Sequence, residues 1–291
     1  MTPLRQKMIR KMQMRRLAER SQQAYLHWMI QLSRHYNCSP DQLSVDQLQH
    51  YIHHLLHDRA LAWSSVNQAA CAIRWFCVHV LGRDDPKFDI GPRTRPKRLP
   101  EIYSADELGR LFDAASNPKH RTLLMTAYAA GLRVGEVVAL KAADIDSYRM
   151  MIRVEQGKGR KDRYTLLSHR LLEQLRGYCR TYRLTRRFRG PLFFGRDHDK
   201  PMDTRTAQRI FYRARDRAAL RVIGGIHLLR HCFATHLMDA GVDVRTIQQL
   251  MGHRAVTTTM RYLQVTRAHL ANVKSPLDLI QFNDDGEKKR A

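Results

Sequence analysis

Apolar residues recur at helical spacing through the first third of the chain. They gather on one side of three successive segments and predict helices at about 17–36, 45–57 and 64–80. The dipeptide Ser39-Pro40 separates the first two segments, because a proline ends a helix near the residue before it. The pattern therefore predicts a first domain made of helices, at residues 1–81.

A stretch rich in glycine, proline and charge follows at residues 82–100, with the sequence GRDDPKFDIGPRTRPKRLP. Such a composition favours an irregular connection over a helix or a strand. We therefore expect residues 82–100 to be a linker and residues 101–291 to form a second domain.

The second domain begins with a helix signal and then changes character. Ser104 with Glu107 is a capping box, and helical spacing continues to about Leu140. Two short strands are predicted at about 150–155 and 163–167, joined by a Gly-Lys-Gly turn, and helical patterns resume from residue 168. The predicted fold is mainly α with a small β-sheet, which makes the second domain an α+β domain.

The chain is strongly basic. It has 51 Lys and Arg against 27 Asp and Glu, a formal charge of +24, and both domains share the excess. A charge of this size favours a polyanionic partner, with nucleic acid as the default. A membrane is not expected, because no apolar run approaches the roughly 20 residues that span a bilayer, and the basic start lacks the apolar core of a signal peptide.

Cysteine and histidine usage gives no metal prediction. Five scattered cysteines without a spaced histidine set are typical of reduced thiols, which favours a cytoplasmic location. Four histidines share one stripe of the predicted second helix: His50, His53, His54 and His57. Their spacing would permit metal ligation, but a polar, solvated or phosphate-facing surface opposite a core stripe explains the pattern better.

Candidate catalytic residues lie in the second domain. Moving a DNA phosphodiester without a metal requires a nucleophile, cations that neutralise the phosphate, and a proton donor for the departing oxygen. Four short motifs supply these types: AAGLRVGEVVAL, GKGRKDR, HLLRH and MGH followed by a tyrosine. The candidates in them are Arg133, Glu136, Lys158, His227, Arg230, His253 and Tyr262.

This ordered set resembles the tyrosine recombinase family, also called the phage integrase family. His253 lies 23 residues after Arg230, and Tyr262 lies 9 residues after His253, both close to the spacings of the family. The motifs cover about 104–270, whereas the helical first third is similar to the family's SAM-like core-binding domain in order and length only. Two small departures, Gly135 in place of a usual serine and Met251 in place of a usual leucine, change no reacting group.

The resemblance implies a site-specific recombinase or integrase, Xer-like or from a mobile element, that cleaves and rejoins DNA through a 3′-phosphotyrosyl intermediate without metal, ATP or any cofactor. Its two domains would form a C-shaped clamp on double-stranded DNA, in a homo-oligomer that becomes a tetramer in the synapse. A short apolar segment after Tyr262 would pack against a neighbouring subunit or against its own domain.

The same resemblance implies a role for each candidate. Tyr262 would attack the phosphorus. Arg133 and Arg230 would stabilise the phosphorane with a hydrogen bond from His253, Lys158 would protonate the leaving oxygen, and His227 would assist deprotonation of the tyrosine. Glu136 is a separate case: its charge would repel a phosphate, so it would either orient an arginine or a histidine or form a salt bridge on the helix surface.

Two other functions fit the same residues. A type IB topoisomerase shares the nucleophile and the cations but reseals the same strand. A catalytically silent DNA-binding protein would need only the charge and the helices, although every catalytic position holds a competent residue. Taken alone, Tyr262 is one of 11 tyrosines, and only its place after the other motifs marks it.

Overall fold

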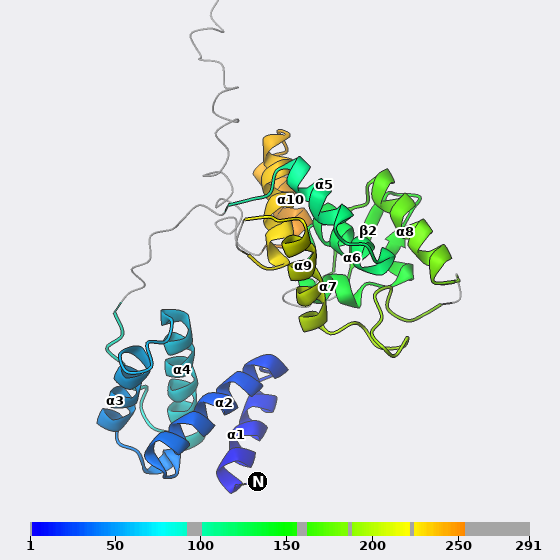
Figure 1. Ribbon diagram of the computed structural model, residues 1–291. Coiled ribbons are helices and arrows are strands. Elements are labelled where there is room, and N and C mark those ends of the chain that lie inside the picture. The colour runs from blue at the N-terminus through cyan, green and yellow to red at the C-terminus, as the bar shows by residue number, and fades with distance from the viewer. Residues whose placement is uncertain (1, 92–100, 156–161, 186–187, 222–223, 254–291) are drawn as a thin grey trace, which may run out of the picture. The chain divides into compact units, whose positions relative to one another are not determined.

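The computed structural model describes residues 2–91, 101–155, 162–185, 188–221 and 224–253 of the chain (Figure 1). Its internal contacts divide it into two compact units, residues 1–97 and 98–291. Each unit has its own hydrophobic core. The described part is mostly helical with one small sheet, which confirms the predicted fold class.

The first unit consists of packed helices. Their bounds are α1 Pro3–Met14, α2 Glu19–Tyr36, the 3-10 turn η1 Pro40–Gln42, α3 Val45–Leu56, α4 Trp63–Phe76 and the π-helical turn η2 Cys77–Leu81. Helix α4 packs against both α2 and α3 and is buried along most of its length. Helix α1 was not predicted, because Met8 and Met12 alone form its buried face.

Residues 82–91, the described part of the expected linker, lie against this helical unit. Phe88 is buried in its core. The Arg83 guanidinium donates to the carbonyls of Asp41 and Leu43, and the Trp63 indole N–H donates to the carbonyl of Gly91 at 2.8 Å. The division into 1–81, 82–100 and 101–291 stays a prediction.

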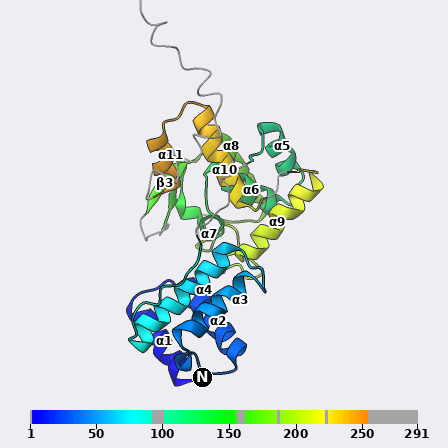
Figure 2. The same ribbon diagram turned by 90° about the vertical axis from the view of Figure 1, so that its left-hand side faces the viewer.

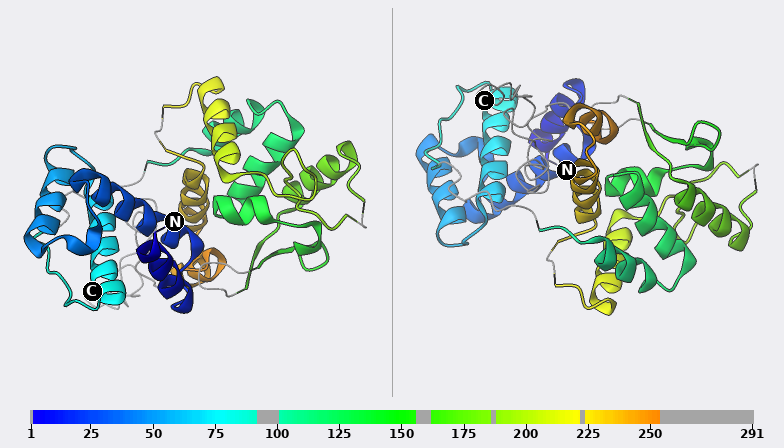
Figure 3. Two further views of the ribbon diagram at one scale, coloured as in Figure 1. Left: turned by 90° about the horizontal axis from the view of Figure 1, so that it is seen from below. Right: turned by 90° about the horizontal axis from the view of Figure 1, so that it is seen from above.

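The second unit combines helices with a three-stranded sheet (Figure 1, Figure 3). Its first elements are α5 Ala105–Asp113, α6 Pro118–Ala129, α7 Val134–Ala139, the 3-10 turn η3 Ala142–Asp144, β1 Ile145–Asp146, β2 Met151–Val154 and β3 Arg163–Leu166. The later elements are α8 His169–Thr181, α9 Thr204–Arg217, α10 His227–Asp239 and α11 Val244–Met251. None of the helices in the described ranges is both long enough and apolar enough to cross a bilayer.

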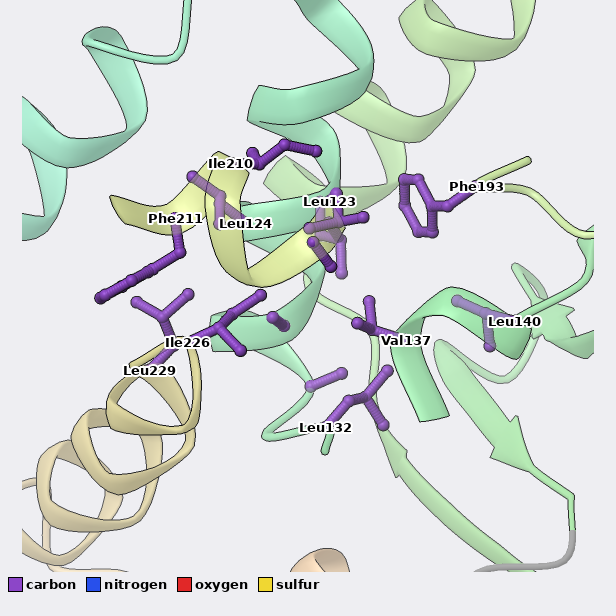
Figure 4. Packing of buried hydrophobic residues seen from close by; sticks show 14 of the residues in the cluster. Leu123, Leu124, Leu132, Val137, Leu140, Phe193, Ile210, Phe211, Ile226 and Leu229 are labelled. Carbon is purple, nitrogen blue, oxygen red and sulfur yellow. The ribbon is translucent and has the colours of Figure 1, made fainter. Parts of the chain in front are cut away.

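Helix α6 lies at the centre of the second unit. It contacts α5, α7, α8, α9 and α10, and its side chains are buried on every side rather than along one stripe. Leu123 and Leu124 of α6 meet Phe211 of α9 and Leu229 of α10 in the core (Figure 4). Because α7 and α10 both pack on α6, their first turns are held in fixed positions.

The sheet is antiparallel in the order β1-β2-β3. Ile152 pairs with Thr165, and both side chains are buried, so the alternate residues Met151 and Tyr164 face outward. Arg163 pairs with Val154 and therefore belongs to the inner face. Strand β3 also contacts α11, which lies beside it in Figure 2. The two-residue strand β1 was not predicted.

Candidate active site

Arg133 and Glu136 lie at the start of α7, where a tight loop leads from α6. Gly131 in this loop has φ +59°, and a β-carbon there would stand 2.3 Å from a ring carbon of Phe233, so only glycine fits. Arg133 is the N-cap residue, and the Glu136 carboxylate accepts its backbone N–H at 2.8 Å and its side-chain Nη1 at 2.7 Å. The pair predicted from the GLR motif is therefore in direct contact.

Arg230 lies in the first turn of α10 and connects three segments. Its guanidinium donates to the carbonyl of Gly131 at 2.6 Å and to the carbonyl of Met251, at the end of α11. Its Nη1 is also 3.8 Å from the carboxylate of Glu136. The side chain is 1% exposed, so these contacts fix the guanidinium almost completely out of solvent.

Arg163 of β3 is a further member of the cluster, and sequence reasoning missed it. Its guanidinium binds both carboxylate oxygens of Glu136, at 2.9 and 2.7 Å, and its Nε donates to the carbonyl of Leu250 at 3.0 Å. In the sequence it looked like one cation of a basic turn. The available signal was its place in the strand, two residues before the inward-facing Thr165.

His227 and His253 stand among these arginines. His227 is the first residue of α10, and His253 follows Gly252, which ends α11 in the left-handed conformation at φ +61°. Burial and then the charge of Arg230 lower the pKa of both imidazoles, in the case of His253 to about 4. Both histidines therefore favour the neutral form at pH 7, in which one ring nitrogen donates and the other accepts.

Glu136 is the only carboxylate in direct contact with these arginines among the described residues. Burial by itself would raise its pKa, but hydrogen bonds from Arg163 and Arg133 outweigh burial and lower the pKa to about 2. The carboxylate is thus ionised at neutral pH. One negative charge faces three guanidiniums, and this excess of positive charge suits an anionic ligand such as a phosphate.

Five of the predicted site residues therefore come together from three separate motifs: Arg133, Glu136, His227, Arg230 and His253. Lys158 and Tyr262 lie outside the described residues. The catalytic roles of all seven stay predictions.

The histidine stripe of α3 forms pairs instead of a ligand set. The His54 ring is hydrogen bonded to Asp58 at 2.8 Å, and the His53 ring stacks on His57 with centroids 4.2 Å apart. Within the described ranges, no group of three His, Cys, Asp or Glu side chains is arranged to hold a metal ion.

Two family models match the chain. The phage integrase family matches residues 98–269, and the N-terminal SAM-like domain of phage integrases matches residues 4–86. Among curated relatives, a putative integrase/recombinase y4qK of Sinorhizobium fredii is 40% identical over 96% of this chain and 90% of its own length. The tyrosine recombinase XerA of Thermococcus onnurineus is 34% identical over 75% of this chain and 76% of its own.

A solved structure agrees with these relatives. The crystal structure of a XerA recombinase is 27% identical, covers 92% of this chain and 95% of that one, and superposes with a TM-score of 0.54. The fold and the family matches define the class as that of site-specific tyrosine recombinases, which are DNA strand-breaking and rejoining enzymes. The chain belongs to the phage integrase family.

The depressed pKa of Glu136 predicts a pH dependence of stability. A carboxylate with a pKa of about 2 in the folded chain, against 4.5 ordinarily, adds stability that is complete above pH 4.5 and is lost as the pH falls toward 2. We expect Glu136→Gln to remove this component, on the order of 3 kcal/mol over the whole titration, and so to flatten the acid-side slope of the free energy of unfolding against pH.

Urea unfolding followed by far-ultraviolet circular dichroism between pH 6 and pH 2.5 measures that slope. Glu173→Gln, on the exposed side of α8, is the matched control and should keep the slope of the unaltered chain. Equal slopes for Glu136→Gln and Glu173→Gln would contradict the role assigned to the buried carboxylate.

Proposed function

We propose that this recombinase cleaves DNA by attack of Tyr262 on the scissile phosphorus, with a 3′-phosphotyrosyl intermediate and without metal or ATP. The observation that supports this proposal best is the cluster of Arg133, Arg230, His227 and His253, in which both arginines face one ionised carboxylate. Two guanidiniums and two neutral imidazoles provide the charge and the donors that a pentacoordinate phosphorane requires.

The two family arginines have different positions in this cluster. The Arg133 side chain is 26% exposed, so it can offer N–H groups to a phosphate from the solvent side. Arg230 is buried and hydrogen bonded to carbonyls, and it adds its charge from the protein side at short range. His253, neutral at pH 7, donates one hydrogen bond to a phosphate oxygen without adding a full charge.

Proton transfer completes the proposed step. The Tyr262 oxygen forms a bond to phosphorus as the bond from phosphorus to the 5′ oxygen breaks. His227 accepts the tyrosine proton, because its lowered pKa leaves the ring unprotonated at pH 7, and Lys158 gives a proton to the departing oxygen. Lys158 lies in the sequence between Val154 and Arg163, which pair across β2 and β3, and Arg163 contacts Glu136. Arg163, five residues after Lys158 in the sequence, is thus in the cluster.

The partner in this proposal is double-stranded DNA, which the two basic units would enclose in a clamp. The net charge of +24 supports contacts that are mostly to phosphate. Rejoining requires the freed 5′-hydroxyl to attack a phosphotyrosine on a partner strand. We therefore propose a homo-oligomer, a tetramer in the synapse, that acts in the cytoplasm.

Replacement of the nucleophile tests the reaction directly. Tyr262→Phe removes only the hydroxyl, so we expect it to abolish covalent DNA adducts and to leave electrophoretic-shift binding intact. A duplex enriched from random DNA by binding to the unaltered chain is the substrate, and denaturing electrophoresis detects the adduct. An adduct formed by the Phe variant would reject Tyr262 as the nucleophile. Relaxation of one plasmid without strand exchange between two sites would favour a type IB topoisomerase.

Independence from metal is a separate prediction. Because arginines and a lysine supply the positive charge in the proposed step, cleavage of the same duplex should continue at an unchanged rate in excess EDTA. Loss of cleavage in EDTA, restored by Mg²⁺ or Mn²⁺, would indicate a metal-dependent nuclease.

A further inference from the structure

All three guanidinium nitrogens of Arg163 donate hydrogen bonds to other groups of the protein. Its two terminal nitrogens bind the two oxygens of Glu136 in a fork, at 2.9 and 2.7 Å, and its Nε donates to the carbonyl of Leu250 at 3.0 Å. The side chain is only 9% exposed. An arginine engaged on all three nitrogens and covered from solvent is arranged to hold protein groups in place, and its geometry does not present a free fork to DNA.

These contacts join three parts of the candidate site. Glu136 holds Arg133 at the start of α7, Leu250 lies in the last turn of α11 just before His253, and Arg163 itself begins β3. One side chain of β3 thus connects the start of α7, with Arg133, to the end of α11, which precedes His253.

The fork also limits what Glu136 can bind. With both oxygens engaged by Arg163, the carboxylate keeps a single side-chain contact with Arg133 at 2.7 Å and stays 3.8 Å from Arg230. If the fork were removed, the oxygens would be available for closer pairing with Arg133 and Arg230. Such pairing would neutralise the positive charge of Arg133 and Arg230, which the reaction uses to stabilise the phosphate.

Gly252 provides the space for this arrangement. A β-carbon at Gly252 would stand 2.7 Å from Cδ and 3.1 Å from Nε of Arg163, and the backbone there has φ +61°. The glycine that precedes His253 is therefore required for the arginine to reach the carbonyl of Leu250. Arg163 of β3 thus packs closely on the end of α11 because residue 252 has no side chain.

We propose that Arg163 is a positioning residue of the active site, which fixes Glu136 and the end of α11 so that Arg133, Arg230 and His253 face one phosphate. This inference rests on the proposed function. It adds to the seven predicted residues an eighth that acts through the others and does not touch the DNA.

The first test separates positioning from DNA binding. Arg163→Met removes the fork, whereas Arg163→Lys keeps the charge without the fork. On the enriched duplex, we expect both variants to lower the single-turnover rate of adduct formation at saturating enzyme, by on the order of 100-fold for Arg163→Met, with the shift Kd close to that of the unaltered chain. The control Arg153→Met alters an outward-facing arginine of β2, paired with Asp144, and should cleave normally.

The second test needs no DNA. Since the charge of Arg163 helps to lower the pKa of His253, Arg163→Met should raise that pKa, and Arg163→Lys should restore much of the shift. Nuclear magnetic resonance titration of the ring, assigned with His253→Gln, measures the change. In a thermal double-mutant cycle, Gly252→Ala should lower Tm less in the Arg163→Met background than in the unaltered chain, because the clash with Cδ is gone.

The outcomes distinguish failure of the positioning role of Arg163 from failure of the proposed function. If the unaltered chain forms an adduct and Arg163→Met forms it at the same rate per bound complex, the positioning role is overturned and the proposed function stands. A loss that follows the fraction of folded protein, or a Kd that weakens in step with the rate, also overturns it. If the unaltered chain forms no adduct, the proposed function fails. If Arg163→Met leaves the pKa of His253 unchanged and the Tm losses are additive, the contacts assigned to Arg163 are overturned.

Discussion

A single largely buried carboxylate, Glu136, holds the arginines of the candidate site together. Three guanidiniums from α7, β3 and α10 lie within 4 Å of its oxygens, and without it they would repel one another in a poorly solvated space. One carboxylate does not fully neutralise three guanidiniums. The cluster keeps an excess of positive charge, which is the property that a site for a phosphodiester needs.

The fold makes this concentration of charge possible by fixing the backbone first. Helix α6 is buried on every side and positions the first turns of α7 and α10 through the core. Two glycines with positive φ, Gly131 and Gly252, then allow close packing against Phe233 and Arg163. The carbonyls of Gly131 and Met251 accept from Arg230, and the carbonyl of Leu250 accepts from Arg163, so these two guanidiniums are anchored at the protein side.

Much of this arrangement could be predicted from the sequence, because it depends on local patterns. Amphipathic spacing located α3 and α4 within one or two residues at their first ends, and the capping box of Ser104 located α5. The motifs located Arg133, Glu136, His227, Arg230 and His253. Each of these lies at a helix end that a glycine or a cap makes visible, and the structure brings all five together.

The rest depends on tertiary contacts that leave little local signal. Helix α1 buries two methionines, and β1 has two residues, so neither has a periodic pattern long enough to detect. Arg163 stands among other cations in GKGRKDR, and only the pairing of β3 with β2 shows that it faces inward to Glu136. The location of Glu136 between three arginines could not be read from its spacing to Arg133 alone.

Identification of the DNA-linked peptide would show whether this charged cluster binds a phosphate that Tyr262 attacks. The unaltered chain would be trapped on a nicked form of its enriched duplex, then digested with nuclease and trypsin for mass spectrometry. Trypsin should release Tyr262 in the peptide YLQVTR, after Arg261 and through Arg267. We expect a nucleotide phosphate on the tyrosine of that peptide, and the same mass on any other peptide would contradict attack by Tyr262.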